Sequence, residues 1–322
     1  MGPVEPIPGG VTSLEVPLRQ PNPDRSQLVL GTDTGFVCIV AVESVGARGY
    51  GLVAEKALKI KAFAPGAAVT AVSVASQQQV VAVTDAGGIF LVDLEAIQAV
   101  AASSVSDSAI VKVGAVDNSA LYDVTALQDS RVFVTAGASP VAQLKIWDPR
   151  AGGGSVGGSI RGGSTVGGAG ERAPPVALFS DGSVGNVGYT SVVSHPTRRD
   201  IVAAGTSDGE LVIWDIRQTR SVVNRLKQHR PGTMVTDLRF DMHQVLYSCG
   251  ADGAALKWDF HAYGTAGSVP EFDHASSTER LSVEALWPTP PGMAAAANTV
   301  DVHPHRDATV VAYDDGAVHW CY

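Results

Sequence analysis

Two stretches of the chain carry the same pattern, and this repetition constrains the fold more than any other feature of the sequence. The first, residues 190–217, reads TSVVSHPTRRDIVAAGTSDGELVIWDIR, and the second, residues 235–260, reads VTDLRFDMHQVLYSCGADGAALKWDF. Each contains two runs of alternating apolar residues, an Asp-Gly pair and a third run that closes on Trp-Asp. An Asp-Gly pair between alternating runs indicates a two-residue β-hairpin turn, because its positions accept positive φ.

The spacing of the two Trp-Asp pairs defines the size of the repeating unit. Trp214 and Trp258 lie 44 positions apart, and a period of about 40 to 45 residues with several short strands is typical of a blade of a WD-repeat β-propeller. Four less regular units surround the two clear copies, at residues 11–42, 68–95, 121–148 and 298–322. The run Arg280–Leu286 alternates like a strand and is assigned to the outer strand of the next unit. We therefore expect an all-β, WD40-type β-propeller with six visible blades.

Four residues of the second clear copy have the types and spacing of a hydrogen-bonded chain. His229 precedes the blade, Asp252 occupies its turn, and Ser248 and Trp258 lie in its second and third strands. We expect His229 to bond toward Asp252, with Ser248 and Trp258 completing the chain. The alternative is a solvated histidine beside an ordinary turn. Either role is structural, as are the roles expected for the corresponding residues of other blades, which are Asp208, Trp214 and Trp147.

A Gly-rich segment interrupts the third unit. Residues 151–170 contain ten Gly mixed with Ser and Thr, a composition that predicts a flexible coil. A phosphate-binding loop would need the G-x-x-x-x-G-K-[ST] pattern followed by a helix, and neither occurs here. We therefore divide the chain into a Pro- and Gly-rich tail at residues 1–10 and a single propeller at 11–322, which carries an insertion at 151–174.

Charge and cysteine content restrict the partners that the chain could take. The net charge of its 322 residues is −9 and the pI is about 5.3, so the overall field repels nucleic-acid phosphates and acidic membrane surfaces. No apolar run reaches the roughly 18 residues of a membrane span. The three cysteines, Cys38, Cys249 and Cys321, are odd in number and lack C-x-x-C spacing, which favours free thiols in a reducing compartment.

No residue pattern predicts catalysis, a metal site, a cofactor or a small-molecule substrate. The pattern G-x-S-x-G occurs around Ser155 and Ser207, but a nucleophile elbow requires a strand before the serine and a helix after it. Ser155 lies in the Gly-rich segment and Ser207 in a hairpin turn. His303 and His305 flank Pro304 in what looks like a turn after a strand, repeated at His195-Pro196, which favours a turn over a ligand pair.

Several segments together resemble a known family. They are LKIWDPR at residues 144–150, SHPTRRDIVAAGTSDGELVIWDIRQ at 194–218, LYSCGADGAALKWDF at 246–260 and the terminal unit NTVDVHP. They are similar to the small WD-repeat nucleoporin of the Y-shaped outer-ring complex of the nuclear pore. This resemblance implies a non-enzymatic scaffold in the nuclear envelope that contacts other outer-ring nucleoporins on the short arm and supports pore assembly, mRNA export and protein transport. It also implies seven blades, where the sequence shows six.

A second function class remains open. The segments WDPR (Trp147–Arg150) and WDIR (Trp214–Arg217) fit the W-D-x-R pattern that resembles substrate receptors of cullin-RING ubiquitin ligases. Arginine in this position is also common as a simple charge at the end of a strand. Co-purification separates the two, since a nucleoporin carries outer-ring partners and a receptor carries a ligase adaptor.

The last unit ends before a fourth strand. The N-terminal segment that closes many propellers would here be MGPVEPIPGG, and Pro and Gly make a poor strand. We therefore predict an incomplete ring with one open edge at residues 11–18 and another formed by His319, Trp320, Cys321 and Tyr322. Free edges invite pairing with another chain, unless the chain is a truncated version of a seven-bladed protein.

Overall fold

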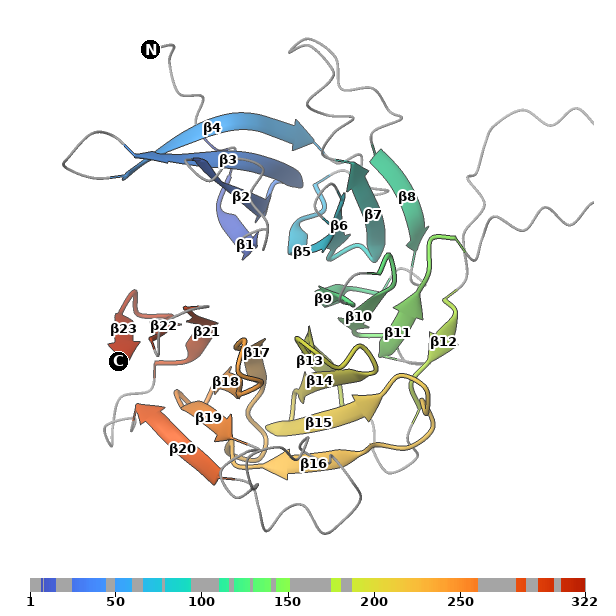
Figure 1. Ribbon diagram of the computed structural model, residues 1–322, viewed down its shortest axis with the longest axis vertical. Helices are drawn as coiled ribbons and strands as arrows, with labels where there is room; N and C mark the ends of the chain where they lie inside the picture. Colours follow the sequence, from blue (N-terminus) through green and yellow to red (C-terminus); the bar gives the residue numbers. More distant parts are fainter. Residues whose placement is uncertain are drawn as a thin grey trace, which may run out of the picture. The chain divides into compact units, whose positions relative to one another are not determined.

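A computed structural model describes most of the β-structure of the chain. The residues it describes are 7, 9–15, 25–44, 50–59, 66–76, 79–93, 110–115, 119–127, 130–139, 143–150, 175–180, 187–259, 282–287, 295–303 and 308–321. Within these residues every regular element is a β-strand, and the strands form six separate antiparallel sheets (Figure 1). The six sheets correspond one to one to the six units predicted from the sequence.

Five of the sheets have four strands each. The first sheet joins β1 (Val11–Glu15), β2 (Arg25–Thr32), β3 (Phe36–Ser44) and β4 (Tyr50–Lys59). The second joins β5 (Val69–Ser76), β6 (Gln79–Thr84), β7 (Gly88–Asp93) and β8 (Ile110–Ala115). The third joins β9 (Leu121–Ala126), β10 (Phe133–Gly137), β11 (Leu144–Trp147) and β12 (Ala177–Leu178), and the fourth joins β13 (Tyr189–Ser194), β14 (Ile201–Thr206), β15 (Glu210–Asp215) and β16 (Asn224–Lys227). The fifth joins β17 (Val235–Phe240), β18 (Leu246–Gly250), β19 (Ala255–Asp259) and β20 (Ser282–Trp287).

The sixth sheet has three strands, which are β21 (Ala297–Val302), β22 (Thr309–Tyr313) and β23 (Val318–Cys321). The chain divides into two compact units. The first comprises residues 1–121, 129–133 and 145–177, and the second comprises 122–128, 134–144 and 178–322.

The tight turns form where the Asp-Gly pairs predict them. Gly209 has φ 81° between β14 and β15, and Gly253 has φ 78° between β18 and β19. An added Cβ at Gly209 would lie 2.6 Å from the carbonyl oxygen of Arg230, so both the backbone conformation and the close approach require glycine there. The turns before β3, β7 and β23 contain Gly35, Gly87 and Gly316, which also have positive φ.

Consecutive sheets of the second unit pack face to face through apolar side chains. Ala203, Leu211 and Ile213 of the fourth sheet form one buried cluster with Val235 and Trp258 of the fifth. The largest fully buried side chains include Trp147, Trp214 and Trp258. Burial of such aromatic residues contributes about 1.5–3 kcal/mol each or more to the free energy of unfolding, which explains why the Trp-Asp unit repeats.

A second contact joins the innermost strands of successive sheets. The threonine in second place on an inner strand donates its hydroxyl to the backbone carbonyl that begins the next inner strand. In the first unit Thr12 bonds Val69 and Thr70 bonds Leu121 at 2.8 Å. In the second unit Thr190 bonds Val235 and Thr236 bonds Ala297, both at 2.5 Å. We call this contact the threonine stitch.

The residue in third place on an inner strand can make a second contact, in which its side chain accepts a backbone N–H of the next inner strand. Asp123 on β9 accepts the N–H of Val192 on β13 at 2.8 Å, and Asp237 on β17 accepts the N–H of Val300 at 3.2 Å. In the first unit Ser13 accepts the N–H of Val72 at 3.1 Å. Each side chain satisfies a backbone group of the next sheet, so these contacts fix the spacing between neighbouring inner strands.

The structure corrects the sequence-based assignment near Arg280–Leu286. The strand in this region, β20, pairs with β19, where Trp258 faces Val283 and Ala255 faces Trp287. It is therefore the outer strand of the sheet formed by the second clear repeat, not of the next unit. Trp287 consequently ends a strand rather than lying in a connector. The sequence analysis also did not predict the outer strands β4 and β8, because no Asp-Gly type turn directly precedes either of them.

Candidate functional site

The four residues expected to form a hydrogen-bonded chain in the fifth sheet do lie in that order. His229 Nδ1 is 3.1 Å from Asp252 Oδ1, and His229 Nε2 is 2.8 Å from Ser248 Oγ. Trp258 Nε1 donates to the same Ser248 Oγ at 2.8 Å. His229, Ser248 and Trp258 are buried. We call this set the blade tetrad.

Each hydrogen bond of the blade tetrad can be assigned one donor and one acceptor. Because the indole N–H can only donate, Ser248 accepts it and can donate its own hydrogen to His229 Nε2. With Nε2 accepting from Ser248, the Nδ1–H of His229 donates to Asp252. Burial alone would raise the pKa of Asp252, but hydrogen bonds from His229 and from the backbone N–H groups of Arg230 and Ala254 bring it below its usual value. The tetrad is therefore a closed structural network rather than an acid–base site.

The fourth sheet lacks this network. The position ten residues before Trp214 holds Ala204, where the fifth sheet has Ser248 ten residues before Trp258. The buried indole N–H of Trp214 has no hydrogen-bond partner within the described residues. Its ring packs edge-on against Phe179 at a centroid distance of 5.1 Å. Asp208 accepts instead from the backbone N–H of Gly232 at 2.9 Å, so it fixes a loop rather than a tetrad.

The two W-D-x-R segments show what their arginines contact. Arg217 forms a two-pronged pair with Asp215, with Nε–Oδ1 at 2.9 Å and Nη2–Oδ2 at 2.6 Å, and it also reaches Asp200 at 2.7 Å. Arg150 pairs with Asp148 in the same way at 3.0 Å. The hydrogen bonds from these arginines lower the pKa of Asp148 and of Asp215. Each arginine thus closes the end of its own strand by pairing with the aspartate two residues before it.

The other residues weighed for chemistry do not come together. Ser207 lies in the turn between β14 and β15, where its Oγ accepts the N–H of Gly188 at 3.1 Å, and a strand rather than a helix follows it. His303 is exposed after β21, whereas His305, Ser155 and the whole insertion at 151–174 lie outside the described residues. Among the residues that the structure describes, no three His, Cys, Asp or Glu side chains are arranged to hold a metal ion. No helix in that part of the chain is long and apolar enough to cross a bilayer.

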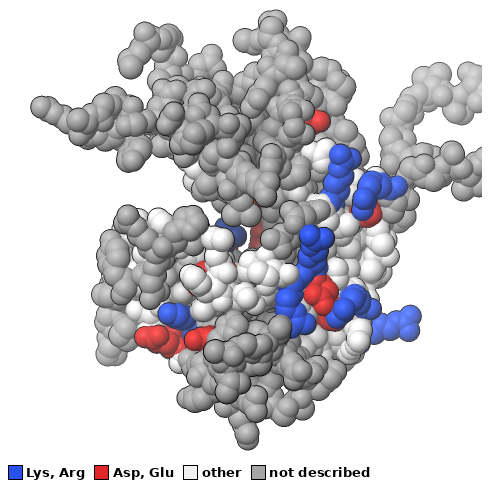
Figure 2. Space-filling view, viewed as in Figure 1, with Lys and Arg blue, Asp and Glu red and all other residues white. Residues whose placement is uncertain are grey.

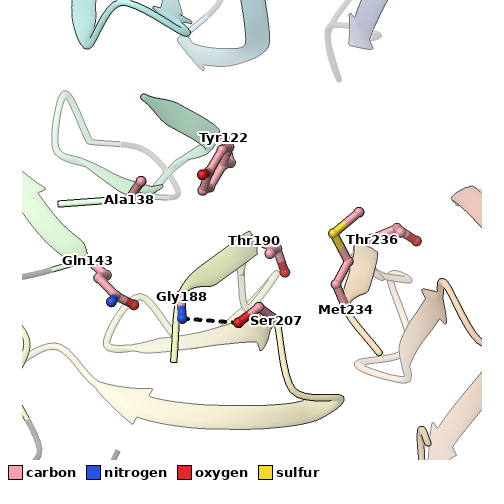
Figure 3. Close-up of a pocket in the computed structure, with 8 residues that line it drawn as sticks. All are labelled: Tyr122, Ala138, Gln143, Gly188, Thr190, Ser207, Met234 and Thr236. Atoms are coloured by element: carbon pink, nitrogen blue, oxygen red, sulfur yellow. Dashed lines mark hydrogen bonds between the residues drawn. The ribbon is translucent and has the colours of Figure 1, made fainter. Parts of the chain in front are cut away.

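A hollow of about 590 Å³ opens in the second unit at the ends of the inner strands (Figure 3). Tyr122 and Met234, both exposed, stand on either side of it, and Gln143 and Ser207 add polar groups. Among the described residues that line it, none is Asp, Glu, Lys, Arg or His. Figure 2 shows basic side chains gathered, with a few acidic ones among them, on the right-hand part of the face in view, and a second, mainly acidic group at the lower left.

The predicted open edge coincides with the last described strand. His319, Trp320 and Cys321 belong to β23, which pairs with β22 in a sheet that contains no further strand among the described residues. The ring of His319 packs on Tyr313 at 5.1 Å, and Cys321 Sγ lies 3.6 Å from the carbonyl oxygen of Leu286. Trp320 is 61% exposed. Tyr322 and residues 16–18 of the second expected edge lie outside the described residues.

Solved structures identify the fold. A β-propeller domain of Cps50 (Swd1) from Myceliophteria thermophila matches 98% of this chain and 87% of its own, with a TM-score of 0.60 and 14% identity. A chain in a crystal structure of the mitotic checkpoint complex matches 92% of this chain and 70% of its own, with a TM-score of 0.58 and 16% identity. The all-β, WD40-type propeller fold is therefore confirmed.

Comparison of amino-acid sequences finds relatives among the nucleoporins. The nucleoporin Nup43 of Homo sapiens is 29% identical over 143 residues, and that of Mus musculus is 29% identical over the same length. This chain is similar to a WD-repeat nucleoporin. The match covers 44% of this chain and 32% of each Nup43. The protein transport protein SEC31 of Mycosarcoma maydis is 30% identical over 118 residues, which is 35% of this chain and 8% of SEC31. No protein-family model matches the sequence.

Sequence reasoning missed the threonine stitches and their Asp and Ser companions. The signal was present, because Thr occupies the second place of four inner strands, as Thr12, Thr70, Thr190 and Thr236. Asp123 and Asp237 follow at the third place of theirs. Alternation patterns classify these positions only as polar, and their partners lie 45 to 69 residues further along the chain.

Proposed function

We propose that this chain is a non-enzymatic scaffold subunit of the outer ring of the nuclear pore complex, the Y complex, and that it resides at the nuclear envelope. The observation that carries the proposal is its similarity over 143 residues to two Nup43 nucleoporins. The Nup43-like role includes contacts with other outer-ring nucleoporins on the short arm. Through these contacts the chain supports pore assembly, mRNA export and protein transport.

The geometry supports a scaffold in two ways. Polar side chains of the blade tetrad and of the threonine stitches bond strands and sheets to one another. The described residues that line the hollow carry no charged or imidazole group. Blades that are joined by these contacts and that present a hollow with uncharged described residues are suited to docking of other proteins.

Co-purification of the full chain tests the proposal. A tagged chain from nuclear-envelope extract should carry outer-ring nucleoporins in fixed ratio. The double variant Arg150→Ala, Arg217→Ala should retain them, because both arginines contact only nearby aspartates in the contacts described above. A ligase adaptor in place of nucleoporins, lost in the double variant, would instead establish the ubiquitin-ligase alternative.

A further inference from the structure

Arginine residues gather in two turns at one end of the fourth sheet. One turn, residues 195–200, joins β13 to β14, and the other, residues 216–221, follows β15. Together they contain four Arg, one Asp and no Lys, whereas the whole chain has an excess of acidic residues and a net charge of −9. Basic side chains gather on the right-hand part of the face in Figure 2, which includes part of the fourth sheet as drawn in Figure 1. This end of the sheet is thus a positively charged region of an acidic protein.

The first of these turns is longer than its counterpart in the fifth sheet. A backbone hydrogen bond between the end residues closes residues 195–201 in the fourth sheet and residues 241–245 in the fifth. The turn of the fourth sheet is therefore two residues longer, and it holds Arg198 and Arg199, whereas that of the fifth sheet holds no arginine. Since the fifth sheet folds without this extra length, the two arginines are not required by the architecture of a blade.

A buried histidine fixes the conformation of the longer turn. His195 is 1% exposed, and its Nδ1 accepts the backbone N–H of Thr197 at 3.3 Å and of Arg198 at 3.1 Å. Its ring packs against Phe240 of β17 at a centroid distance of 4.9 Å. The backbone that carries Arg198 and Arg199 is therefore held in place before any partner binds, which lowers the entropy cost of binding.

The two turns are joined to each other. Arg217 Nη2, in the second turn, lies 2.7 Å from Asp200 Oδ2 in the first. The backbone N–H of Ile216 donates to the carbonyl oxygen of Asp200 at 2.8 Å. An ion pair and a backbone hydrogen bond thus hold the two turns side by side, so that their exposed residues belong to one surface.

Carboxylates at this end of the sheet are taken up by internal contacts, and arginines are presented outward. Asp215 is buried, and hydrogen bonds from Arg217 keep its pKa below the usual value, with a further contribution from the nearby charge of Arg198. Arg199 and Arg220 are exposed and Arg198 is partly exposed. We call Arg198, Arg199 and Arg220 the arginine surface.

We propose that the arginine surface binds an acidic segment of another polypeptide. The planar guanidinium group can donate two parallel hydrogen bonds to one carboxylate. The exposed side chains of Thr197, Gln218 and Ser221 lie on the same turns and can donate to the backbone carbonyls of the bound segment. Arg217 has a different role, since its contacts with aspartates hold the turns together. The proposal does not depend on whether the chain acts at the nuclear pore.

The composition of the two turns favours a polypeptide over other polyanions. Single-stranded nucleic acid is bound by stacking of its bases on aromatic side chains, and residues 195–200 and 216–221 include no Phe, Tyr or Trp. A long nucleic acid or an acidic membrane would also extend beyond the arginine surface, where the net charge of −9 repels it. A short acidic segment avoids this repulsion.

Binding of a labelled acidic peptide to the full chain tests the proposal. A fluorescein-labelled peptide of alternating Glu and Ser should bind with saturation at micromolar concentrations by fluorescence anisotropy. Arg199→Glu, Arg220→Glu should weaken binding at least tenfold. The matched control Lys227→Glu, Arg230→Glu makes the same change of charge at exposed residues of the same unit and should have little effect.

Thermal melts check that both double variants remain folded, and Arg199→Gln, Arg220→Gln repeats the test with a smaller change. High salt should also weaken binding, because it screens exposed charges. Absence of saturable binding, or equal losses in the two charge-reversal variants, would overturn the proposal. So would a dT oligonucleotide of equal charge that binds more tightly than the peptide and is lost in the same variant, since the ligand would then be a nucleic acid.

Photo-crosslinking tests whether such a segment is bound in a cell extract. The full chain with p-benzoylphenylalanine in place of Gln218 is added to an extract of cells that express the protein and is irradiated. Crosslinks should map to segments rich in Asp and Glu, and an excess of the acidic peptide should suppress them. Arg199→Glu, Arg220→Glu should suppress them as well. Crosslinks to segments without acidic residues, or crosslinks that neither the peptide nor the variant reduces, would contradict the proposal.

Discussion

Trp258 Nε1 donates to Ser248 Oγ at 2.8 Å, whereas Ala204 takes the place of that serine beside the equivalent Trp214, whose Nε1 has no hydrogen-bond partner among the described residues. The two clear repeats thus bury the same indole in two states of hydrogen bonding. An unsatisfied buried donor costs more than a formed hydrogen bond contributes. Comparison of the two blades therefore isolates the effect of one hydrogen bond to a buried indole N–H.

Exchanging the two side chains should shift stability in opposite directions. Ser248→Ala should lower the free energy of unfolding by about 1–3 kcal/mol, because it leaves Trp258 and His229 without a shared partner. Ala204→Ser should raise it by about 0.5–1.5 kcal/mol, because the new hydroxyl can accept the N–H of Trp214. Urea titrations of both variants measure the changes. A destabilising Ala204→Ser would mean that the site cannot place the hydroxyl.

Removal of the buried indole itself should be far more costly. Trp258→Ala should destabilise by about 3–5 kcal/mol, because it opens a cavity in the cluster with Leu238 and Leu246. The matched control Trp320→Ala removes the same side chain from an exposed position and should change stability by less than about 0.5 kcal/mol. Thermal melts compare them, and similar losses for both would contradict the burial described for the two strands.

The threonine stitches should contribute measurably to the free energy of unfolding. Thr236→Val keeps the shape of the side chain but removes the hydroxyl that bonds Ala297, so it should cost about 1 kcal/mol. Asn298→Ala, at the corresponding place on β21, should be close to neutral in the isolated chain, because Asn298 is exposed. Chemical denaturation gives both values. Equal effects would show that the stitch adds nothing beyond side-chain packing.

Asp123 should make stability depend on pH. Burial raises its pKa to about 7, although the N–H groups of Val192 and Val124 act to lower it. The folded state then holds a proton that the unfolded chain has lost above pH 4. The resulting contribution is complete below about pH 4 and is lost as the pH rises to about 7, by on the order of a few kcal/mol. Asp123→Asn should lack this component, so the wild-type minus variant difference should fall from pH 4 to 7. A difference that is flat or rises would contradict the pKa assignment.

Some of these features could be predicted from the sequence and others could not, for physical reasons. The blade tetrad could be predicted, because Ser248, Asp252 and Trp258 lie within one hairpin and the Asp-Gly turn fixes their spacing. The partner of Thr70 could not, because Leu121 lies on another sheet and no local pattern marks its carbonyl. The outward position of Trp320 on β23 could not be predicted either, since only the pairing with Val310 shows which face of the sheet Trp320 occupies.

The outer strands were the least predictable elements. The strand β20 follows residues whose pattern gives no turn signal, so its alternation alone could not show which sheet it joins. Pairing of Ala255 with Trp287 settles that it closes the fifth sheet. The expected edge at β23 and the division into a tail, a propeller and an insertion remain predictions.

Residence of the chain at nuclear pores is the most direct test of the scaffold account. The full chain, fused to a fluorescent protein at its endogenous locus, should give a punctate signal at the nuclear rim that recovers slowly after photobleaching, as expected for a structural subunit. Trp258→Ala should lose the rim signal in proportion to its loss of folded protein. A diffuse signal for the wild-type chain, or recovery as fast as that of a freely diffusing protein, would contradict the account.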